Sequence, residues 1–317
     1  MTTTRIGRVT AAFLLTALLV LSVIALSACG AGDDSASPSA SPSAGPITVT
    51  DDSGAEVTLD QPAVRIVSLA PANTEIAYAI GAGDKMVAGT SYDDYPEEAK
   101  SLPKIGDFAN PSVEKIVSFQ PDLILSAGGI QASLRSKFEK LGVQVYVVDP
   151  TTYEGVMTSI AELGQLAGTS EMAQEVVDTM KQAQTDVQEK VGSLDKATTF
   201  LEIYSKPLMT AGSNTFIDDM ILIAGGQNIG AEAGSGYPTY STEVLVQKDP
   251  VVYIADSGSM SEPGDISKRA GFSELTAVTD GRVYVIDDNL IARSGPRLAQ
   301  GLQELAKMIH PEAYAAQ

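Results

Sequence analysis

Three pairs of neighbouring acidic residues are the first candidates for chemistry in this chain: Asp93 and Asp94, then Asp218 and Asp219, then Asp287 and Asp288. A glycoside hydrolase would need two carboxylates that face each other across a sugar ring. The spacing of the pairs along the sequence gives no reason for any two of them to meet. We therefore expect solvated acids in loops and helices, and the sequence does not favour a glycosidase.

Histidine and cysteine chemistry is limited by number, because the 317 residues include one Cys and one His. A zinc site usually takes several ligands of these two types. A Ser-His-Asp or Cys-His group would have to use His310, for which we expect a surface or capping role before Pro311. Calcium-loop and complete phosphate-loop motifs are absent from the sequence. These features argue against an enzyme, and we expect no cofactor and no metal.

Aromatic and polar residues outside the regular segments indicate a binding site instead. In the first half of the chain, loops just after predicted strands contain Tyr92, Tyr95 and Phe108. The second half contains Tyr204, Tyr237 and Tyr240, with Asn289 and Arg293 before its last helix. In open α/β sheets, ligands bind beyond the carboxyl ends of the strands. Aromatic rings there can cover a large flat ligand and donate hydrogen bonds at their rims, although any one of these tyrosines could equally pack a loop.

Short apolar runs that alternate with amphipathic runs must position these residues. After a hairpin of residues 47–50 and 56–59, we expect strands at 65–69, 85–89, 122–126, 143–148, 198–204, 251–255 and 282–286. We expect helices at 74–80, from Pro111, and at 131–140, 153–167, 170–191, 215–224, 242–247 and 295–309. The alternation predicts an α/β fold with two three-layer lobes, 47–169 and 193–317, each with a parallel sheet. One long rigid helix at 170–192 bridges them.

An internal repeat supports two equivalent lobes. Residues 112–125 match residues 241–254, with Ser, Glu, Val and Pro at identical offsets in a helix–turn–strand unit. Glu114 and Glu243 occupy the same place in the two copies. Any two such units share some of these features, because Ser caps helices and Glu favours their first turn. We favour a true pseudo-symmetric pair.

The first residues predict export and lipid attachment. Arg5 and Arg8 precede an uncharged run at 11–28, which fits a signal peptide or, alternatively, a membrane anchor. The segment at 26–30 (LSACG) resembles a bacterial lipobox and contains Cys29. The resemblance implies a signal peptide at 1–28, cleavage before Cys29 and attachment of lipid to its sulfur. The Ser/Ala/Pro-rich residues up to 46 then form a tether, residues 29–46.

The charge of the chain excludes one class of partner. Lys and Arg number 21 against 40 Asp and Glu, which gives a net charge of −19. A nucleic-acid-binding protein needs a basic face to neutralise phosphates. We therefore expect no nucleic acid among the partners.

Several motifs of the body resemble the cluster A (class III) substrate-binding proteins of ABC importers, the family that carries cobalamin, ferric siderophores and haem. They are SYDDYP at 91–96, GDFANPSVEKI at 106–116, PDLIL at 121–125, ARSGPR at 292–297 and MIHPE at 308–312. The resemblance covers nearly all of the chain from residue 47. It implies two lobes bridged by one long helix, a monomer on the outer face of the cytoplasmic membrane, and partnership with a permease and its ATPase.

Site residues follow from the same resemblance. The permease-docking glutamates of the family fall on Glu114 and Glu243. Positions that line the cleft of the family's cobalamin-binding proteins fall on Tyr92, Phe108, Tyr237 and Arg293, near Asn289, and on Ser126. Tyr204 is added from its place at the end of a predicted strand. The family's tryptophans at the positions of Phe108, Tyr237 and Ser126 are replaced here, which leaves the identity of the ligand open.

Charge narrows the choice of ligand. A tris-catecholate ferric siderophore is strongly anionic and needs several arginines or lysines, whereas Arg293 is the one arginine that we place in the cleft. An aromatic, weakly basic cleft suits a corrinoid such as cobalamin. A hydroxamate ferric siderophore is the alternative, and haem held through a tyrosine stays open. Two hypotheses from other functional classes are an extracytoplasmic enzyme and an adhesion or sensory lipoprotein.

Overall fold

The computed structural model describes residues 45–258 and 264–315. The predicted signal peptide, Cys29 and the tether up to residue 44 lie outside the described residues. Within those two ranges, no helix has both the length and the apolar character required to cross a membrane.

The described chain begins with the predicted hairpin. Strands β1 (Ile47–Thr50) and β2 (Glu56–Leu59) pair antiparallel, with Ile47 opposite Leu59. Asp51 closes the turn, because its Oδ1 accepts hydrogen bonds from the backbone N–H and the hydroxyl of Ser53. Its other oxygen pairs with Arg135 at 2.6 Å, which fastens the hairpin to the body.

The N-terminal sheet has four parallel strands in the order β4-β3-β5-β6. Its strands are β3 (Ile66–Ser68), β4 (Met86–Ala88), β5 (Leu123–Ala127) and β6 (Gln144–Val148). Its helices are α1 (Pro71–Ala79), α2 (Val113–Ser118), α3 (Arg135–Glu139) and α4 (Tyr153–Ala167). All four strands end at the same edge of the sheet, as a parallel arrangement requires. The α/β class with a parallel sheet is therefore confirmed.

Several predicted helix starts are wrong by one or more residues, among them those at residues 131 and 295, where the helices begin at Arg135 and Leu298. Helix α1 begins at Pro71 and not at Thr74, since proline lacks the N–H that the first turn leaves unpaired, and Thr74 lies buried inside the helix. Helix α2 begins at Val113, one residue after its N-cap Ser112, whose hydroxyl accepts from the N–H of Lys115. The helix starts after Ser112 and not at Pro111, because the Ser112 hydroxyl pairs with a backbone N–H of the first turn that would otherwise have no partner.

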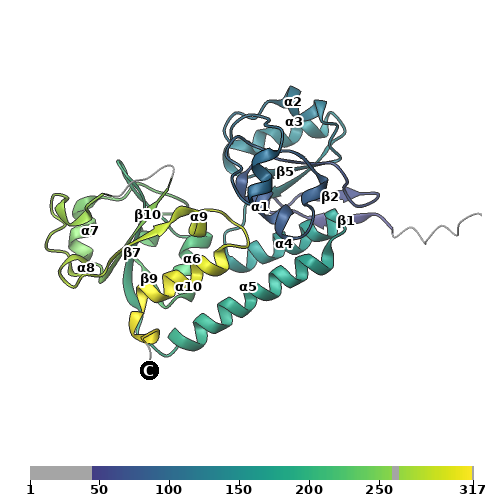
Figure 1. Cartoon of the computed structure of the whole chain (residues 1–317). Helices are drawn as coiled ribbons and strands as arrows, with labels where there is room; N and C mark the ends of the chain where they lie inside the picture. Colours follow the sequence, from purple (N-terminus) through teal and green to yellow (C-terminus); the bar gives the residue numbers. More distant parts are fainter. Residues whose placement is uncertain (1–44, 259–263, 316–317) are drawn as a thin grey trace, which may run out of the picture. The chain divides into compact units, whose positions relative to one another are not determined.

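Helix α5 (Ser170–Val191) has the bounds that the sequence predicts. It packs against α1 and α4 of the N-terminal part and against α6 (Phe216–Ile223) and α10 (Leu298–Ile309) of the C-terminal part (Figure 1). Its buried side recurs at helical spacing, at Ala173, Val177, Met180, Ala183, Val187 and Val191. Met172 near the start of the helix is 47% exposed. A Cβ at Gly164 would lie 2.3 Å from that of Ala173, so this glycine permits the close approach of α4 and α5.

The C-terminal sheet has the order β11-β10-β7-β8, with β9 beside β7. Its strands are β7 (Ala197–Ser205), β8 (Leu208–Thr210), β9 (Gly226–Asn228), β10 (Val252–Ser257) and β11 (Val283–Asp287). Besides α6 and α10, its helices are α7 (Thr242–Lys248), α8 (Thr276–Thr279) and α9 (Asp288–Ile291). Strand β8 pairs antiparallel with β7 and departs from the predicted parallel sheet. Four short elements, three or four residues long, were not predicted from the sequence: β8, β9, α8 and α9.

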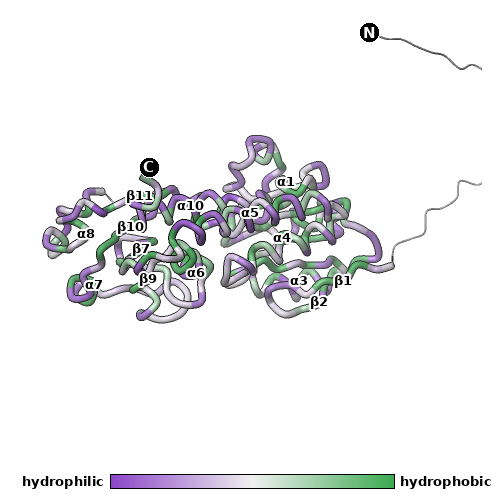
Figure 2. Tube along the Cα trace, turned by 90° about the horizontal axis from the view of Figure 1, so that it is seen from below, coloured by the Kyte–Doolittle hydropathy of each residue, from purple (hydrophilic) through white to green (hydrophobic). Residues whose placement is uncertain are grey.

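The two sheets share one connection pattern. In each, a strand (β3 or β7) pairs in parallel with the strand that follows the repeat helix, β5 after α2 and β10 after α7. One core cluster joins α4, α5, α6 and α10, and α6 is largely green in Figure 2. Separate smaller clusters lie on the other face of each sheet, under α2 and α3 and under α7 and α8. The internal repeat therefore occupies equivalent places in the two sheets.

Candidate functional site

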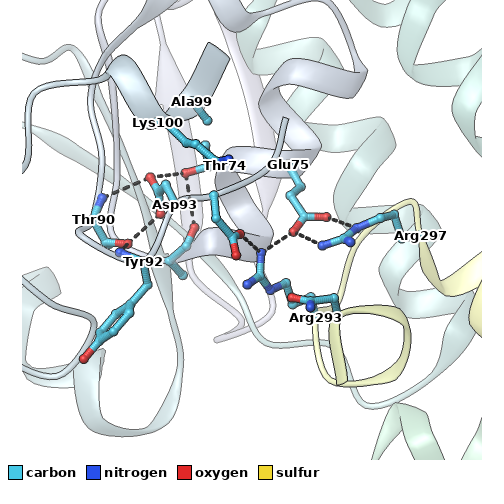
Figure 3. Close-up of polar contacts among 12 residues, drawn as sticks. Thr74, Glu75, Thr90, Tyr92, Asp93, Ala99, Lys100, Arg293 and Arg297 are labelled. Atoms are coloured by element: carbon cyan, nitrogen blue, oxygen red, sulfur yellow. Dashed lines mark hydrogen bonds and ion pairs between the residues drawn. The ribbon is translucent and has the colours of Figure 1, made fainter. Parts of the chain in front are cut away.

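A buried carboxylate, Asp93, shapes the loop that follows β4. Its oxygens accept hydrogen bonds from the hydroxyl of Thr74 at 2.8 Å and from the N–H and hydroxyl of Thr90 at 3.0 and 2.5 Å (Figure 3). Burial raises the pKa of Asp93, although these donors act in the opposite direction. Asp93 is therefore not the solvated acid that the sequence predicted. It anchors the loop to α1 and leaves Tyr92 and Asp94 on either side of the buried group.

Four charged side chains connect this loop and α1 to the segment before α10. Glu75 of α1 accepts from Arg293 Nη1 at 2.7 Å, and from Arg297 Nε and Nη2 at 2.8 and 2.6 Å (Figure 3). Asp94 Oδ1 accepts from the same Arg293 nitrogen at 2.6 Å. We call Glu75, Asp94, Arg293 and Arg297 the ion cluster. It joins residues about 200 positions apart in the sequence, so it fastens α1 and the loop after β4 to the segment before α10.

Electrostatics within the ion cluster follow from its pairing. Partial burial alone would raise the pKa of Asp94, but the hydrogen bond and charge of Arg293 hold that pKa below its ordinary value. Burial likewise works against the charge of Arg293, yet Asp94 and Glu75 raise the pKa of the guanidinium. The predicted cleft arginine therefore has two carboxylate partners within the protein.

Asp149 of the N-terminal part and Tyr237 of the C-terminal part are close enough for the charge of Asp149 to act on Tyr237. Asp149 follows β6, and its carboxylate lies over Gly128 at the end of β5, where a Cβ would come within 1.7 Å of Oδ2. Tyr237 lies in the loop after β9 and is 43% exposed. Removal of the hydroxyl from water raises the pKa of Tyr237 to about 12, and the negative charge of Asp149 contributes to the rise. The ion cluster, Asp149 and Tyr237 thus bring residues of both parts of the chain into one shared region. We call this region the facing edges.

Acidic side chains also gather at the end of β10. Asp256 is 5% exposed, and its neighbour Ser257 stands beside Asp287 of β11 in the parallel register. Burial, followed by the charges of Asp288, Glu202 and Asp287, raises the pKa of Asp256 to about 7. Within the described parts of the chain, no three His, Cys, Asp or Glu side chains are arranged to hold a metal ion.

The other predicted cleft residues lie on loops and strand ends of both sheets. Tyr92 is 57% exposed, and its ring points away from the ion cluster (Figure 3). Phe108 is half-buried, and its carbonyl accepts from Gln131 Nε2 at 2.8 Å. Tyr204 lies near the end of β7, and Asn289 in α9 donates to Asp287 Oδ1 at 2.8 Å. In the described structure, Tyr92, Phe108, Tyr204, Tyr237, Asn289 and Arg293 make no hydrogen bond or ion pair with one another.

The predicted docking glutamates occupy matching places. Glu114 and Glu243 are both exposed and both stand second in a short helix. Each helix has a serine N-cap, Ser112 or Ser241, whose hydroxyl accepts from the N–H three residues on. The structure therefore gives the two glutamates the same local geometry.

Two corrections concern residues with an assigned surface role. Asp218 accepts from Asn228 Nδ2, and Asp219 accepts from the Tyr153 N–H, both at 2.8 Å, so this acid pair is structural. His310 is buried at the end of α10, where Nδ1 is 2.8 Å from Glu312 and Nε2 is 3.1 Å from the Gly225 carbonyl. Its position agrees with the predicted capping role and not with a surface role.

Sequence reasoning missed Glu75, Arg297, Asp149 and Asp256 as members of the facing edges. Glu75 and Arg297 each stand in a helix or at its start, and neither has a local partner in the sequence. The spacing of Arg293 and Arg297, four residues apart, was an available signal for one shared partner. Asp149 and Asp256 come directly after predicted strands, and ligand-binding residues of α/β proteins occur at that position.

Comparisons with known proteins agree with this architecture. A family model described as "Periplasmic binding protein" matches residues 66–290. An uncharacterised ABC transporter substrate-binding lipoprotein of Bacillus subtilis is 35% identical, over 94% of this chain and 97% of its own length. A vitamin B12-binding protein of Vibrio campbellii is 30% identical, over 78% of this chain and 89% of its own.

A solved structure gives the same result for the fold. The periplasmic vitamin B12-binding protein of Vibrio cholerae superposes with a TM-score of 0.72 at 29% identity, and the match covers 80% of this chain and 99% of that one. The resemblance inferred from the motifs is thereby confirmed. The chain belongs to the periplasmic binding protein family, in the group that contains substrate-binding proteins of ABC transporters.

Proposed function

We propose that this protein is the extracytoplasmic receptor of an ABC importer and captures a corrinoid, such as cobalamin, in a cleft between the facing edges. In this proposal residues 47–169 and 193–317 are the two lobes, and 170–192 is the linking helix. The observation that carries it is the make-up of the facing edges, with exposed tyrosines and arginines already paired to carboxylates. Such a surface suits a large, flat ligand without net negative charge.

The relatives support the same ligand class. Two of the compared proteins, from Vibrio campbellii and Vibrio cholerae, are named for vitamin B12 binding and match most of this chain. The alternatives are a ferric hydroxamate siderophore and haem. Haem draws support from a haem-binding protein of Roseiflexus, 26% identical with a TM-score of 0.69, and from exposed tyrosines that could supply an axial ligand.

Calorimetric titration tests the ligand. The chain from Ala44 onward forms one compact unit and can be studied without the lipid anchor. We expect one-to-one binding of cyanocobalamin, and weaker or undetectable binding of a ferric trihydroxamate and of haemin. Tight binding of the iron complex or haemin without binding of cyanocobalamin would reject the corrinoid and keep the receptor role.

Two further parts of the proposal concern the membrane. We propose that Cys29 carries the lipid and holds the receptor at the outer face of the cytoplasmic membrane, and that Glu114 and Glu243 dock on the permease. The matching N-cap geometry of the two glutamates supports the docking role, since a permease with two equivalent subunits would meet two equivalent acids. Lipid labelling of growing cells should mark the wild-type protein and leave Cys29→Ser unlabelled. Equal labelling of both would reject lipid attachment at this residue.

A further inference from the structure

In the ion cluster, Arg293 and Arg297 both donate hydrogen bonds to one buried carboxylate, that of Glu75. We propose that Glu75 is a specificity-determining residue, because it occupies Arg293 and Arg297 and thereby denies anionic ligands the cations they would need. This inference rests on the proposed function in one respect, that the ligand lies between the facing edges. It adds a residue and a mechanism that select the charge of that ligand.

The geometry around Glu75 is that of a filled binding site. Its side chain is 2% exposed and accepts three hydrogen bonds from the two guanidinium groups. Arg297 approaches as a fork, with Nε on one carboxylate oxygen and Nη2 on the other. A bidentate pair of this kind is the arrangement by which arginine binds a ligand carboxylate or phosphate. Glu75 therefore occupies the position that an anionic ligand would take.

The other partners of Arg293 and Arg297 also make these arginines less available to an anionic ligand. Asp94 accepts from Arg293 Nη1 at 2.6 Å, so two carboxylates balance two guanidinium charges and the ion cluster is neutral. The ring of Tyr95 lies 4.4 Å from the Arg297 guanidinium and covers a part of it. An incoming anion would have to displace Glu75 or Asp94 before it could bind to either arginine.

Acids beyond the ion cluster add repulsion. The charge of Asp149 acts on Tyr237 at the facing edges, Asp287 is the last residue of β11, and Asp288 begins α9. A site discriminates between ligands by repelling one of them as well as by attracting the other. A neutral or cationic ligand with N–H donors meets acceptors here, whereas a multiply charged anion meets further negative charge.

Paired titrations of variants test the role of Glu75. The probes are cyanocobalamin, which is neutral, and a ferric tris-catecholate, which has three negative charges. In Glu75→Gln we expect affinity for the anionic probe to rise at least about tenfold relative to cyanocobalamin, the gain of roughly one charge-assisted hydrogen bond. Glu75→Asp keeps the charge and should keep the original selectivity. Glu304→Gln removes an equal charge from a pair with Lys307 on α10 and should change neither affinity.

The ratio of the two affinities separates selection from simple structural support. A purely structural Glu75 would lower both affinities together in Glu75→Gln and leave their ratio unchanged, which would overturn the inference. Asp94→Asn gives a second test should Glu75→Gln fail to fold, because the Asp94 side chain is 55% exposed and its loss should be tolerated. It frees Arg293 in part and should shift the ratio in the same direction. An unchanged ratio in a folded Asp94→Asn would also overturn the inference.

The same data keep the two proposals distinct. If the wild-type protein fails to bind cyanocobalamin while the variants gain the anionic probe, the corrinoid assignment fails and the role of Glu75 stands. If the wild-type protein binds cyanocobalamin and the folded variants gain no anionic probe, the corrinoid assignment stands and the role of Glu75 fails.

Discussion

Replacing Asp256 by asparagine should remove a large part of the pH dependence of stability. Asp256 lies at the carboxyl end of β10 with its side chain almost wholly enclosed. Burial and the neighbouring charges of Asp288, Glu202 and Asp287 raise its pKa from 3.8 to about 7. The ionised carboxylate is therefore disfavoured in the folded protein relative to the unfolded chain.

The sign of the effect follows from proton binding. The folded state holds the proton of Asp256 more tightly than the unfolded state, so the free energy of unfolding falls as pH rises between the two pKa values. The penalty is absent well below pH 3.8 and complete above pH about 7. Because the pKa is raised by about three, ionisation of Asp256 lowers the free energy of unfolding by about 4 kcal/mol in total. Roughly 2.5 kcal/mol of this loss should develop between about pH 5 and 8.

Urea unfolding followed by far-UV circular dichroism measures this difference, since the chain has no tryptophan to report by fluorescence. The wild-type protein and Asp256→Asn are compared at several pH values from about 5 to 8 at constant ionic strength. The asparagine itself adds an offset that does not depend on pH, so the slope of the difference is the test. Asp195→Asn, which removes an exposed acid in the turn before β7, is the matched control.

We expect the stability of Asp256→Asn to increase relative to the wild-type protein as pH rises, and the stability of Asp195→Asn to follow the wild-type protein throughout. Parallel curves for the wild-type protein and Asp256→Asn would refute the reasoning. They would mean that Asp256 titrates near its ordinary value in spite of its enclosure.

Three further outcomes are expected. The double variant Glu114→Ala with Glu243→Ala should abolish ligand uptake by cells and leave the dissociation constant unchanged, because both side chains are exposed on short helices; a large loss of affinity would reject docking. Tyr237→Ala should weaken ligand binding by about tenfold through lost aromatic contact, and unchanged affinity would place the ligand elsewhere. Glu202→Gln should lower the free energy of unfolding by about 3 kcal/mol, since Glu202 is buried and pairs with Arg269; a change below about 1 kcal/mol would contradict that.

Local sequence signals determined the long elements of this protein. Helix α4 has the predicted bounds because Thr152 caps its first turn, with its hydroxyl accepting from Gly155, and Gly168 ends it at a positive φ of 69°. Helix α5 contains no glycine or proline over 22 residues and repeats apolar residues at helical spacing. Caps, stops and periodicity lie within a few residues of each other, so the sequence alone is enough to find them.

Short elements depended on partners distant in the sequence. Strands β8 and β9 are three residues each and exist because both pair with β7, at opposite ends of the same edge. Three residues cannot display a period, so no pattern could predict them. The internal repeat, in contrast, predicted that α2 with β5 and α7 with β10 take equivalent places.

Side-chain roles at the facing edges were decided by tertiary structure. The sequence placed Arg293 in a cleft and treated Asp93 and Asp94 as solvated acids. The fold buries Asp93 under two threonines and brings Asp94 and Glu75 to Arg293 from almost 200 residues or more away. Charge pairing of this kind depends on distances through space, which composition and local spacing do not contain. The sequence therefore determined the kind of fold and the residue types available for binding, and the packing of the two sheets decided which charges remain for a ligand.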